Sequence, residues 1–309
     1  MPQVAATAFK PLRTLTVACG FLAACAVQPP ASPPSAGEAA VIEANRRADA
    51  YSRGGNLEGA ARYYREAIRL AQSVEDADGI AANAISLSVV YQRLGKHAEA
   101  RASLAPVLEQ SRLNFSPDRL AQASLRRAVL DLDERRLASA GEWIDRAAFH
   151  CGQRGCALAG AIQNVKGQLA LEAGQLEAAA ASARAALSAS RASGDRAEAA
   201  NALRLLGVTA IRAGDAAAAS GFLSEALAID RGLAVPRKIY LDLISLGRAS
   251  ALKGDRGAAR SFYERALVVS EAERNTKGAA EARSLIEALG DKPGSRQTQP
   301  ASTGSHAGQ

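Results

Sequence analysis

Small and apolar residues recur along the middle of the chain at the spacing of a helix face. In the segment "RAGDAAAASGFLSEALAID", Ala219, Leu223 and Ala226 stand four and then three positions apart, which places them on one side of an α-helix. Valine, isoleucine and threonine do not gather in the alternating runs that indicate β-strands. The pattern predicts an all-α protein.

These helical segments recur at a fixed step of 40 residues, or 39 in one case. They align on a turn residue, which is an arginine in one degenerate copy and a glycine in the others: Gly55, Gly95, Arg135, Gly174, Gly214 and Gly254. A fixed period of this length is the signature of a solenoid, in which each repeat packs against its neighbours.

Each copy predicts two helices joined by a tight turn. Glycine reaches the left-handed conformation that ends a helix at little cost, and Asn56, Asp215 and Asp255 can each cap the helix that follows. The second helix carries small residues two turns apart, so that it can nest against the first, with a bulky residue between them. The small positions are Ala60, Ala67, Ala100, Val107, Ala140, Ala147, Ala179, Ala186, Ala219, Ala226, Ala259 and Ala266, and the bulky ones are Tyr64, Leu104, Ile144, Leu223 and Tyr263.

This pattern resembles the tetratricopeptide repeat over residues 39–290. The fifth copy also matches the first-helix pattern of that family at Leu203, Leu206 and Gly207, as does the sixth at positions 243, 246 and 247. Ala48 and Ala128 replace the glycine in the first and third copies. The step exceeds the family's usual step of about 34 residues, which implies an extended variant with longer helices.

The resemblance implies a right-handed α-solenoid of six helix pairs. Ser116 and Pro117 form a cap and first position for one helix, and Pro236 opens another. A single helix from Asn275 or Thr276 to about Leu289 is expected to cap the stack. Residues 291–309 have almost no apolar content and predict a disordered tail.

The first residues predict a signal peptide. Lys10 and Arg13 precede "TLTVACGFLAA", eleven residues without charge, and this is the layout of a secretory signal. The run is far shorter than the ~20 residues that span a bilayer. The segment from Leu22 to Cys25 resembles the bacterial lipoprotein lipobox, which implies cleavage after residue 24 and lipidation of Cys25. Ala26 in place of aspartate implies sorting to the outer membrane.

Residues 25–38 are expected to be a lipidated cysteine and a proline-rich tether, because "AVQPPASPPS" favours an extended chain of about 3.1 Å per residue. The formal charge of the whole chain is +7. Without the signal and the tail it falls to +4, too little for the concentrated basic patch that binds nucleic acid.

Cys151 and Cys156 flank "GQRG" between two predicted helices. An oxidising periplasm favours a disulfide between them, and Gly152 and Gly155 permit the turn that it needs. Two free buried thiols are an alternative, and so is a metal site with His150, although a structural zinc ion would then lack a fourth ligand.

No nucleophile elbow, phosphate loop or HExxH motif occurs, and His97 and His306 stand alone. The sequence therefore predicts a protein that is not an enzyme, without cofactor or metal. A groove for cell-wall sugar would require exposed aromatic residues, and Trp143 is the candidate, although its place on a second helix favours the core.

The tetratricopeptide resemblance places partner-binding residues on the first helix of each pair, which lines the concave face. Asn45 and Asp49 stand where the chaperone-binding version of the family has its lysine–asparagine clamp, so that clamp is absent. The arginines and amides on this face suit an acidic and apolar peptide. The polar candidates are Asn45, Arg46, Gln92, Gln122, Asn164, Gln168, Asn201, Arg204, Arg212 and Arg248.

Together these features predict an outer-membrane lipoprotein whose periplasmic solenoid is a scaffold for protein partners. By resemblance, the partners belong to envelope machines: pilus or secretin assembly, outer-membrane protein assembly, or recruitment of cell-wall hydrolases. A factor that acts on or regulates peptidoglycan is the alternative, and a cytosolic regulator with a spurious signal is a third.

Overall fold

The computed structural model describes residues 34–109, 113–152 and 156–290. The predicted signal, Cys25, most of the tether, His306 and the predicted tail lie outside these residues. The chain divides into one unit that ends at Ser35 and a second that begins at Ala36, and the fold described below is that of the second unit. Among the described residues, no helix is both long enough and apolar enough to cross a membrane.

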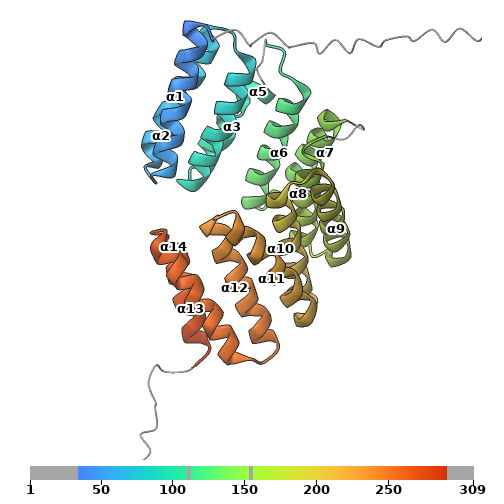
Figure 1. Ribbon diagram of the computed structural model, residues 1–309. Coiled ribbons are helices and arrows are strands. Elements are labelled where there is room, and N and C mark those ends of the chain that lie inside the picture. Colours follow the sequence, from blue (N-terminus) through green and yellow to red (C-terminus); the bar gives the residue numbers. More distant parts are fainter. Residues whose placement is uncertain (1–33, 110–112, 153–155, 291–309) are drawn as a thin grey trace, which may run out of the picture. The chain divides into compact units, whose positions relative to one another are not determined.

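The second unit is a succession of helix pairs, and no strand occurs in its described part (Figure 1). The first two pairs are α1 (Ala36–Arg53) with α2 (Leu57–Ser73), and α3 (Ala77–Arg93) with α4 (His97–Ala102) and α5 (Ala105–Leu108). The third and fourth are α6 (Pro117–Asp133) with α7 (Leu137–Cys151), and α8 (Ala159–Glu172) with α9 (Leu176–Ser193). The last two are α10 (Arg196–Arg212) with α11 (Ala216–Gly232), and α12 (Pro236–Leu252) with α13 (Arg256–Ala272), followed by α14 (Thr276–Ala288). The predicted all-α solenoid of six pairs and a final helix is confirmed.

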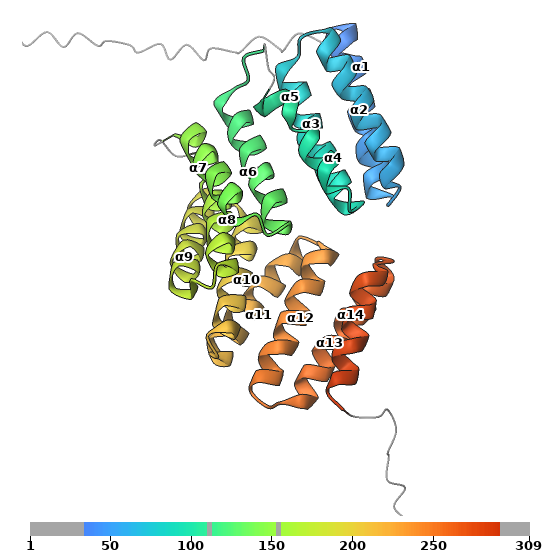
Figure 2. The ribbon, with the colours of Figure 1, turned by 180° about the vertical axis from the view of Figure 1, so that it is seen from behind.

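The first helices of neighbouring pairs also contact one another directly. Contacts join α1 to α3, α3 to α6, α6 to α8, α8 to α10 and α10 to α12, and the row can be followed from behind in Figure 2. The first helices therefore form one continuous face, and each second helix packs behind the first helix of its own pair.

The predicted turns have the expected backbone. The five turn glycines adopt positive φ angles between 72° and 82°, and Arg135 adopts the same left-handed conformation, with φ of 58°, in the degenerate copy. The caps are also confirmed, because the carboxylates of Asp215 and Asp255 each accept from a backbone N–H three residues on, at 2.9 Å.

Close approach of the two helices within a pair depends on small residues. The alanines that the sequence places five positions after each turn residue are all fully buried. Where a first helix carries glycine, the partner side chain fills the space: a Cβ atom at Gly207 would lie 2.5 Å from Leu223 Cγ, and one at Gly247 would lie 2.2 Å from Tyr263 Cε1. These glycines therefore admit the bulky residue of the second helix.

The second pair differs from the expectation of one continuous second helix. The helix breaks after Ala102 and resumes at Ala105. Pro106 causes the break, because proline lacks the N–H that a helix needs and its ring clashes with the carbonyl four residues earlier, which here belongs to Ala102. Leu104 and Val107 are nevertheless buried, so the broken helix still supplies its predicted core contacts.

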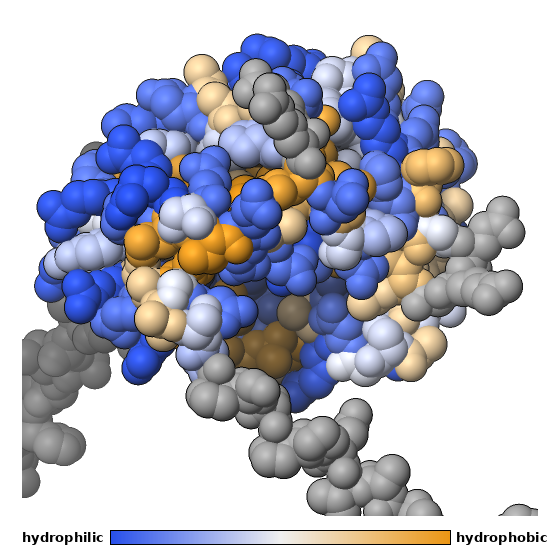
Figure 3. All heavy atoms as spheres, turned by 90° about the horizontal axis from the view of Figure 1, so that it is seen from above, coloured by the Kyte–Doolittle hydropathy of each residue, from blue (hydrophilic) through white to orange (hydrophobic). Residues whose placement is uncertain are grey.

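Hydrophilic residues cover most of the surface in the view of Figure 3, with apolar residues gathered in strips and at the bottom of a recess.

Trp143 is not part of an exposed aromatic surface. It is 8% exposed, and the guanidinium carbons of Arg146 and Arg127 lie 4.4 and 5.2 Å from its ring centroid. It is therefore a core residue in contact with two cations.

Gly247→Ala is expected to lower the free energy of unfolding by about 1–3 kcal/mol, because the added methyl group displaces the Tyr263 ring in a packed core. The matched control is Gly221→Ala on α11, where a Cβ atom meets nothing within 4 Å, so the better helix propensity of alanine is expected to raise stability by about 0.5–1 kcal/mol. Urea denaturation followed by circular dichroism measures both. Equal effects at the two positions would contradict the packing role of Gly247.

Candidate functional site

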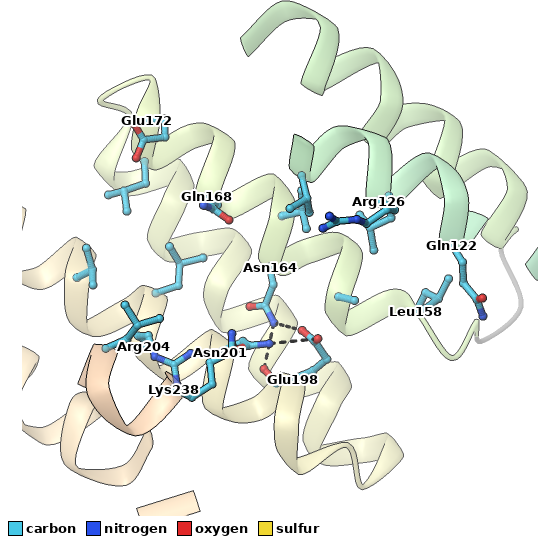
Figure 4. A pocket seen from close by; sticks show the side chains of 18 of the residues that line it. Gln122, Arg126, Leu158, Asn164, Gln168, Glu172, Glu198, Asn201, Arg204 and Lys238 are labelled. Atoms are coloured by element: carbon cyan, nitrogen blue, oxygen red, sulfur yellow. Dashed lines mark hydrogen bonds between the residues drawn. The ribbon is translucent and has the colours of Figure 1, made fainter. Parts of the chain in front are cut away.

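The first-helix face contains a cavity of about 740 Å³, which we call the central cavity (Figure 4). Its volume lies within the range of pockets that hold small ligands. Apolar side chains form much of its wall, including Leu125, Val129, Leu205, Val208 and Leu241. The wall is built from α3, α6, α8, α10 and α12, so five consecutive repeats contribute to one site.

Six of the ten polar candidates named from the sequence line this cavity: Gln122, Asn164, Gln168, Asn201, Arg204 and Arg212. The other four lie elsewhere on the first helices. Asn45 donates to Asn83 Oδ1 at 2.8 Å, and Arg46 is exposed beside Glu43 on α1. Gln92 contacts Arg126 and Asp133, and Arg248 forms a half-exposed ion pair of 2.9 Å with Glu281.

A chain of hydrogen bonds joins three helices across the cavity wall (Figure 4). Asn164 Nδ2 on α8 donates to Glu198 Oε2 at 2.7 Å and to the Glu198 carbonyl at 3.0 Å. Asn201 Nδ2 on α10 donates to Glu198 Oε1 at 3.2 Å, and Asn201 Oδ1 accepts from Lys238 Nζ on α12 at 2.8 Å. Both oxygens of the Glu198 carboxylate thus face amides.

Arg204 differs from the expectation that it grips a partner's carboxylate. It is 9% exposed, and its Nε donates to Asp242 Oδ1 at 2.7 Å. One terminal nitrogen pairs with Asp230 and lies 3.4 Å from Asp242 Oδ2, and the other donates to Asn201 at 2.9 Å. All three nitrogens are used inside the protein, so Arg204 joins α10, α11 and α12 at the cavity wall.

Arg212 is likewise occupied, at the edge of the cavity. It donates to the Leu171 carbonyl at 2.7 Å and lies 3.5 Å from Glu172 Oε1. It therefore links α8 to α10, with its side chain 45% exposed.

Lys238 and Arg126 also line the cavity, and the sequence reasoning did not name them. Arg126 Nε donates to Ser88 Oγ at 2.7 Å, and a terminal nitrogen donates to Gln92 Oε1 at 2.6 Å. Burial lowers the pKa of Arg126 to about 10, although Asp133 opposes the shift. The sequence predicts that Lys238 lies near the start of one first helix and Arg126 in the middle of another. It does not predict that both side chains are partly buried in the wall of the cavity.

Burial also lowers the pKa of Lys238, and the nearby Arg204 adds to the shift. Glu198 and Asp230 oppose it. Among the described residues, the acceptor of Lys238 is the Asn201 amide, and no carboxylate forms an ion pair with it. Its positive charge is therefore held in the cavity wall by a neutral partner.

The structure joins Cys151 and Cys156 by a disulfide, with their Cα atoms 5.3 Å apart. Helix α7 ends at Cys151, and Gly152 turns the chain with φ of 70°. The two sulfurs are thus not available as thiolate ligands beside His150. Within the described ranges, no group of three histidine, cysteine, aspartate or glutamate side chains could hold a metal ion.

The buried Arg204 cluster predicts a pH dependence of stability. Burial raises the pKa of Asp242 to about 7, although Arg204 opposes the shift, and Asp230 raises it further. An exposed aspartate titrates near pH 4, so the folded state holds a proton that the unfolded state releases between these values. Stability must then fall as pH rises through this window.

Between pH 5 and pH 8, the wild type is expected to lose on the order of 2 kcal/mol of unfolding free energy relative to Asp242→Asn, which cannot ionise. Urea denaturation of both proteins at the two pH values measures the difference. A gap between them that does not change with pH would refute the assignment.

Comparisons with known proteins agree with this architecture. The tetratricopeptide repeat profile matches residues 39–112, and no curated protein matches the chain by sequence. The APC/C hetero-tetramer Cut9–Hcn1 has a similar fold, with 13% identity and a TM-score of 0.60, over 81% of this chain and 43% of that one.

A signal transduction ATPase with a tetratricopeptide repeat sensor, from Pyrococcus horikoshii, matches with 15% identity and a TM-score of 0.57, over 82% of this chain and 38% of that one. The chain therefore spans less than half the length of these two proteins. PilW, a type IV pilus biogenesis factor, matches with 17% identity and a TM-score of 0.53, over 79% of this chain and 98% of that one. At these identities the likenesses show the fold alone, an all-α solenoid like that of tetratricopeptide-repeat proteins, and the repeat profile itself is matched over residues 39–112.

Proposed function

We propose that the protein is an adaptor that holds a protein partner in its central cavity, and that a lipid on Cys25 anchors it to the periplasmic face of the outer membrane. The observation that carries the adaptor role is the cavity itself. It is formed by five repeats of a fold whose stacked helices present a continuous binding surface, and it combines an apolar wall with polar groups that can orient a bound segment.

The anchor is supported by sequence alone. The basic region, the uncharged run and the segment from Leu22 to Cys25 precede the proline-rich stretch in the order of a lipoprotein signal. PilW shares the fold and is a pilus biogenesis factor, and this makes assembly of an envelope machine the setting that we favour for the adaptor.

The cavity predicts a specific loss of partners. Leu241 lies on α12, is 37% exposed and lines the cavity, so Leu241→Asp is expected to place a charge on the apolar wall and abolish capture of the partner. Leu252 lies on the same helix, is 48% exposed and is outside the cavity wall, which makes Leu252→Asp the matched control. Crosslinking in cells followed by affinity capture and mass spectrometry compares both with the wild type.

Partners lost with Leu241→Asp and kept with Leu252→Asp would support the adaptor role. An identical set of partners for all three proteins would refute binding in the cavity. Thermal denaturation of the two variants shows whether either has lost its fold.

The anchor predicts labelling with palmitate. Cells that express the wild type and are fed with a palmitate analogue are expected to label the protein, whereas Cys25→Ala abolishes the label and leaves the signal uncleaved, because the lipidated residue is absent. If the wild-type protein incorporates no palmitate analogue, the proposed anchor is wrong. The adaptor role is tested separately, by the crosslinking and affinity capture of the Leu241→Asp variant.

A further inference from the structure

Two cations of the central cavity have no carboxylate partner among the described residues. Lys238 Nζ donates to the Asn201 amide at 2.8 Å, and Arg126 donates to Ser88 and Gln92. The other two cations of the wall are paired, Arg204 with Asp230 and Asp242, and Arg212 with Glu172. The unpaired charges thus belong to α6 and α12, on either side of the apolar wall.

An ammonium group that is largely buried needs compensation, since loss of water around a charge is costly. Lys238 has three N–H donors, and one of them meets Asn201. One acid of the wall, Glu198, already accepts from Asn164 and Asn201 with its two oxygens. Lys238 therefore retains donors that the protein does not use, at the surface of the cavity.

A buried acceptor on the same wall is also without a partner. Asn164 is 8% exposed, and its Nδ2 is fixed by two bonds to Glu198, which determines the direction of its oxygen. Asn164 Oδ1 has no hydrogen-bond partner among the described residues. Figure 4 shows this oxygen on the side of Asn164 that faces away from the Glu198 carboxylate.

The unsatisfied oxygen of Asn164 and the cation of Lys238, which has no ion-pair partner among the described residues, line the same cavity and define what a ligand must offer. It must bring a hydrogen-bond donor for Asn164 and an anion for Lys238. Its remaining surface must be apolar, because Leu205, Val208 and Leu241 line the same cavity. A peptide segment with one acidic side chain among aliphatic residues offers all three, since each backbone amide supplies an N–H donor.

We propose that the central cavity recognises its partner through one acidic residue flanked by aliphatic residues, whose carboxylate pairs with Lys238 while a neighbouring backbone N–H donates to Asn164 Oδ1. This inference rests on the proposed adaptor function and adds the chemistry of the bound segment. Arg126, at the α6 side of the cavity, strengthens the preference for acidic over basic segments.

A random dodecapeptide library displayed on phage, selected against the full-length protein in detergent, tests the proposal without knowledge of the natural partner. The selected peptides are expected to contain an aspartate or glutamate between aliphatic residues. The most enriched peptide is then synthesised with a fluorescent label, together with a version in which the acid is replaced by its amide, and binding is measured by fluorescence polarisation.

We expect the amide version to bind the wild type about tenfold more weakly, as is typical of the loss of one charge-assisted hydrogen bond. Lys238→Met is expected to weaken binding of the acidic peptide by a similar factor and to bind the two peptides equally. Lys238→Arg keeps the charge and is expected to keep the preference. Lys253→Met is the matched control, because Lys253 lies exposed at the end of the same helix and should leave both affinities unchanged.

The comparison of peptides on the wild type needs no variant, so it remains decisive if Lys238→Met fails to fold. Selection of peptides without acidic enrichment, equal binding of the acid and amide versions, or an acid preference that persists in Lys238→Met would each overturn the inference. So would the absence of any selected peptide whose binding is lost with Leu241→Asp. The adaptor function fails separately, when the set of captured partners is unaffected by Leu241→Asp.

Discussion

The close approach of the two helices in each pair is the constraint on which the rest of this structure depends. It is possible only where small residues meet, and the chain provides them as fully buried alanines on the second helices and as Gly207 and Gly247 on the first. The first helices of neighbouring pairs also contact one another. This continuous row is what brings residues of five repeats around one cavity.

Much of the fold could be predicted from the sequence, because its determinants are local and repeated. Turn glycines, capping residues and buried alanines recur at the same place in each copy, and the structure confirms them. Pro106 causes the break in the second helix of the second pair. The repeat pattern does not predict this break, because it is defined by the residues that the copies share and Pro106 occurs in one copy.

The candidate site was less predictable, because its chemistry depends on pairs of residues from different repeats. Arg204 stands at a position that the sequence predicts to face a protein partner, yet the acids that it pairs with, Asp230 and Asp242, lie 26 and 38 residues later in the same chain. Lys238 precedes the α12 positions that the repeat pattern predicts to face a partner, so periodicity does not identify it. Its importance appears only when burial, the Asn201 amide and the commitment of Glu198 are seen together. The period of the sequence predicts which residues share a helix face. It does not predict which charged residues of different repeats pair with one another, because that depends on the three-dimensional packing.

The position of Arg204 has a consequence for how this binding surface can change in evolution. Arg204 lines the cavity and also pairs with two buried acids, Asp230 and Asp242, so that it joins three helices. Loss of the guanidinium would leave those acids facing each other in the core, at a high cost in stability. Gln122, Gln168 and Leu241 also line the cavity but pair with no buried acid, so substitutions there can change the lining without disturbing the Arg204 cluster. The lining of the cavity can therefore be altered by substitution at these three positions, whereas a change at Arg204 also alters the stability of the fold.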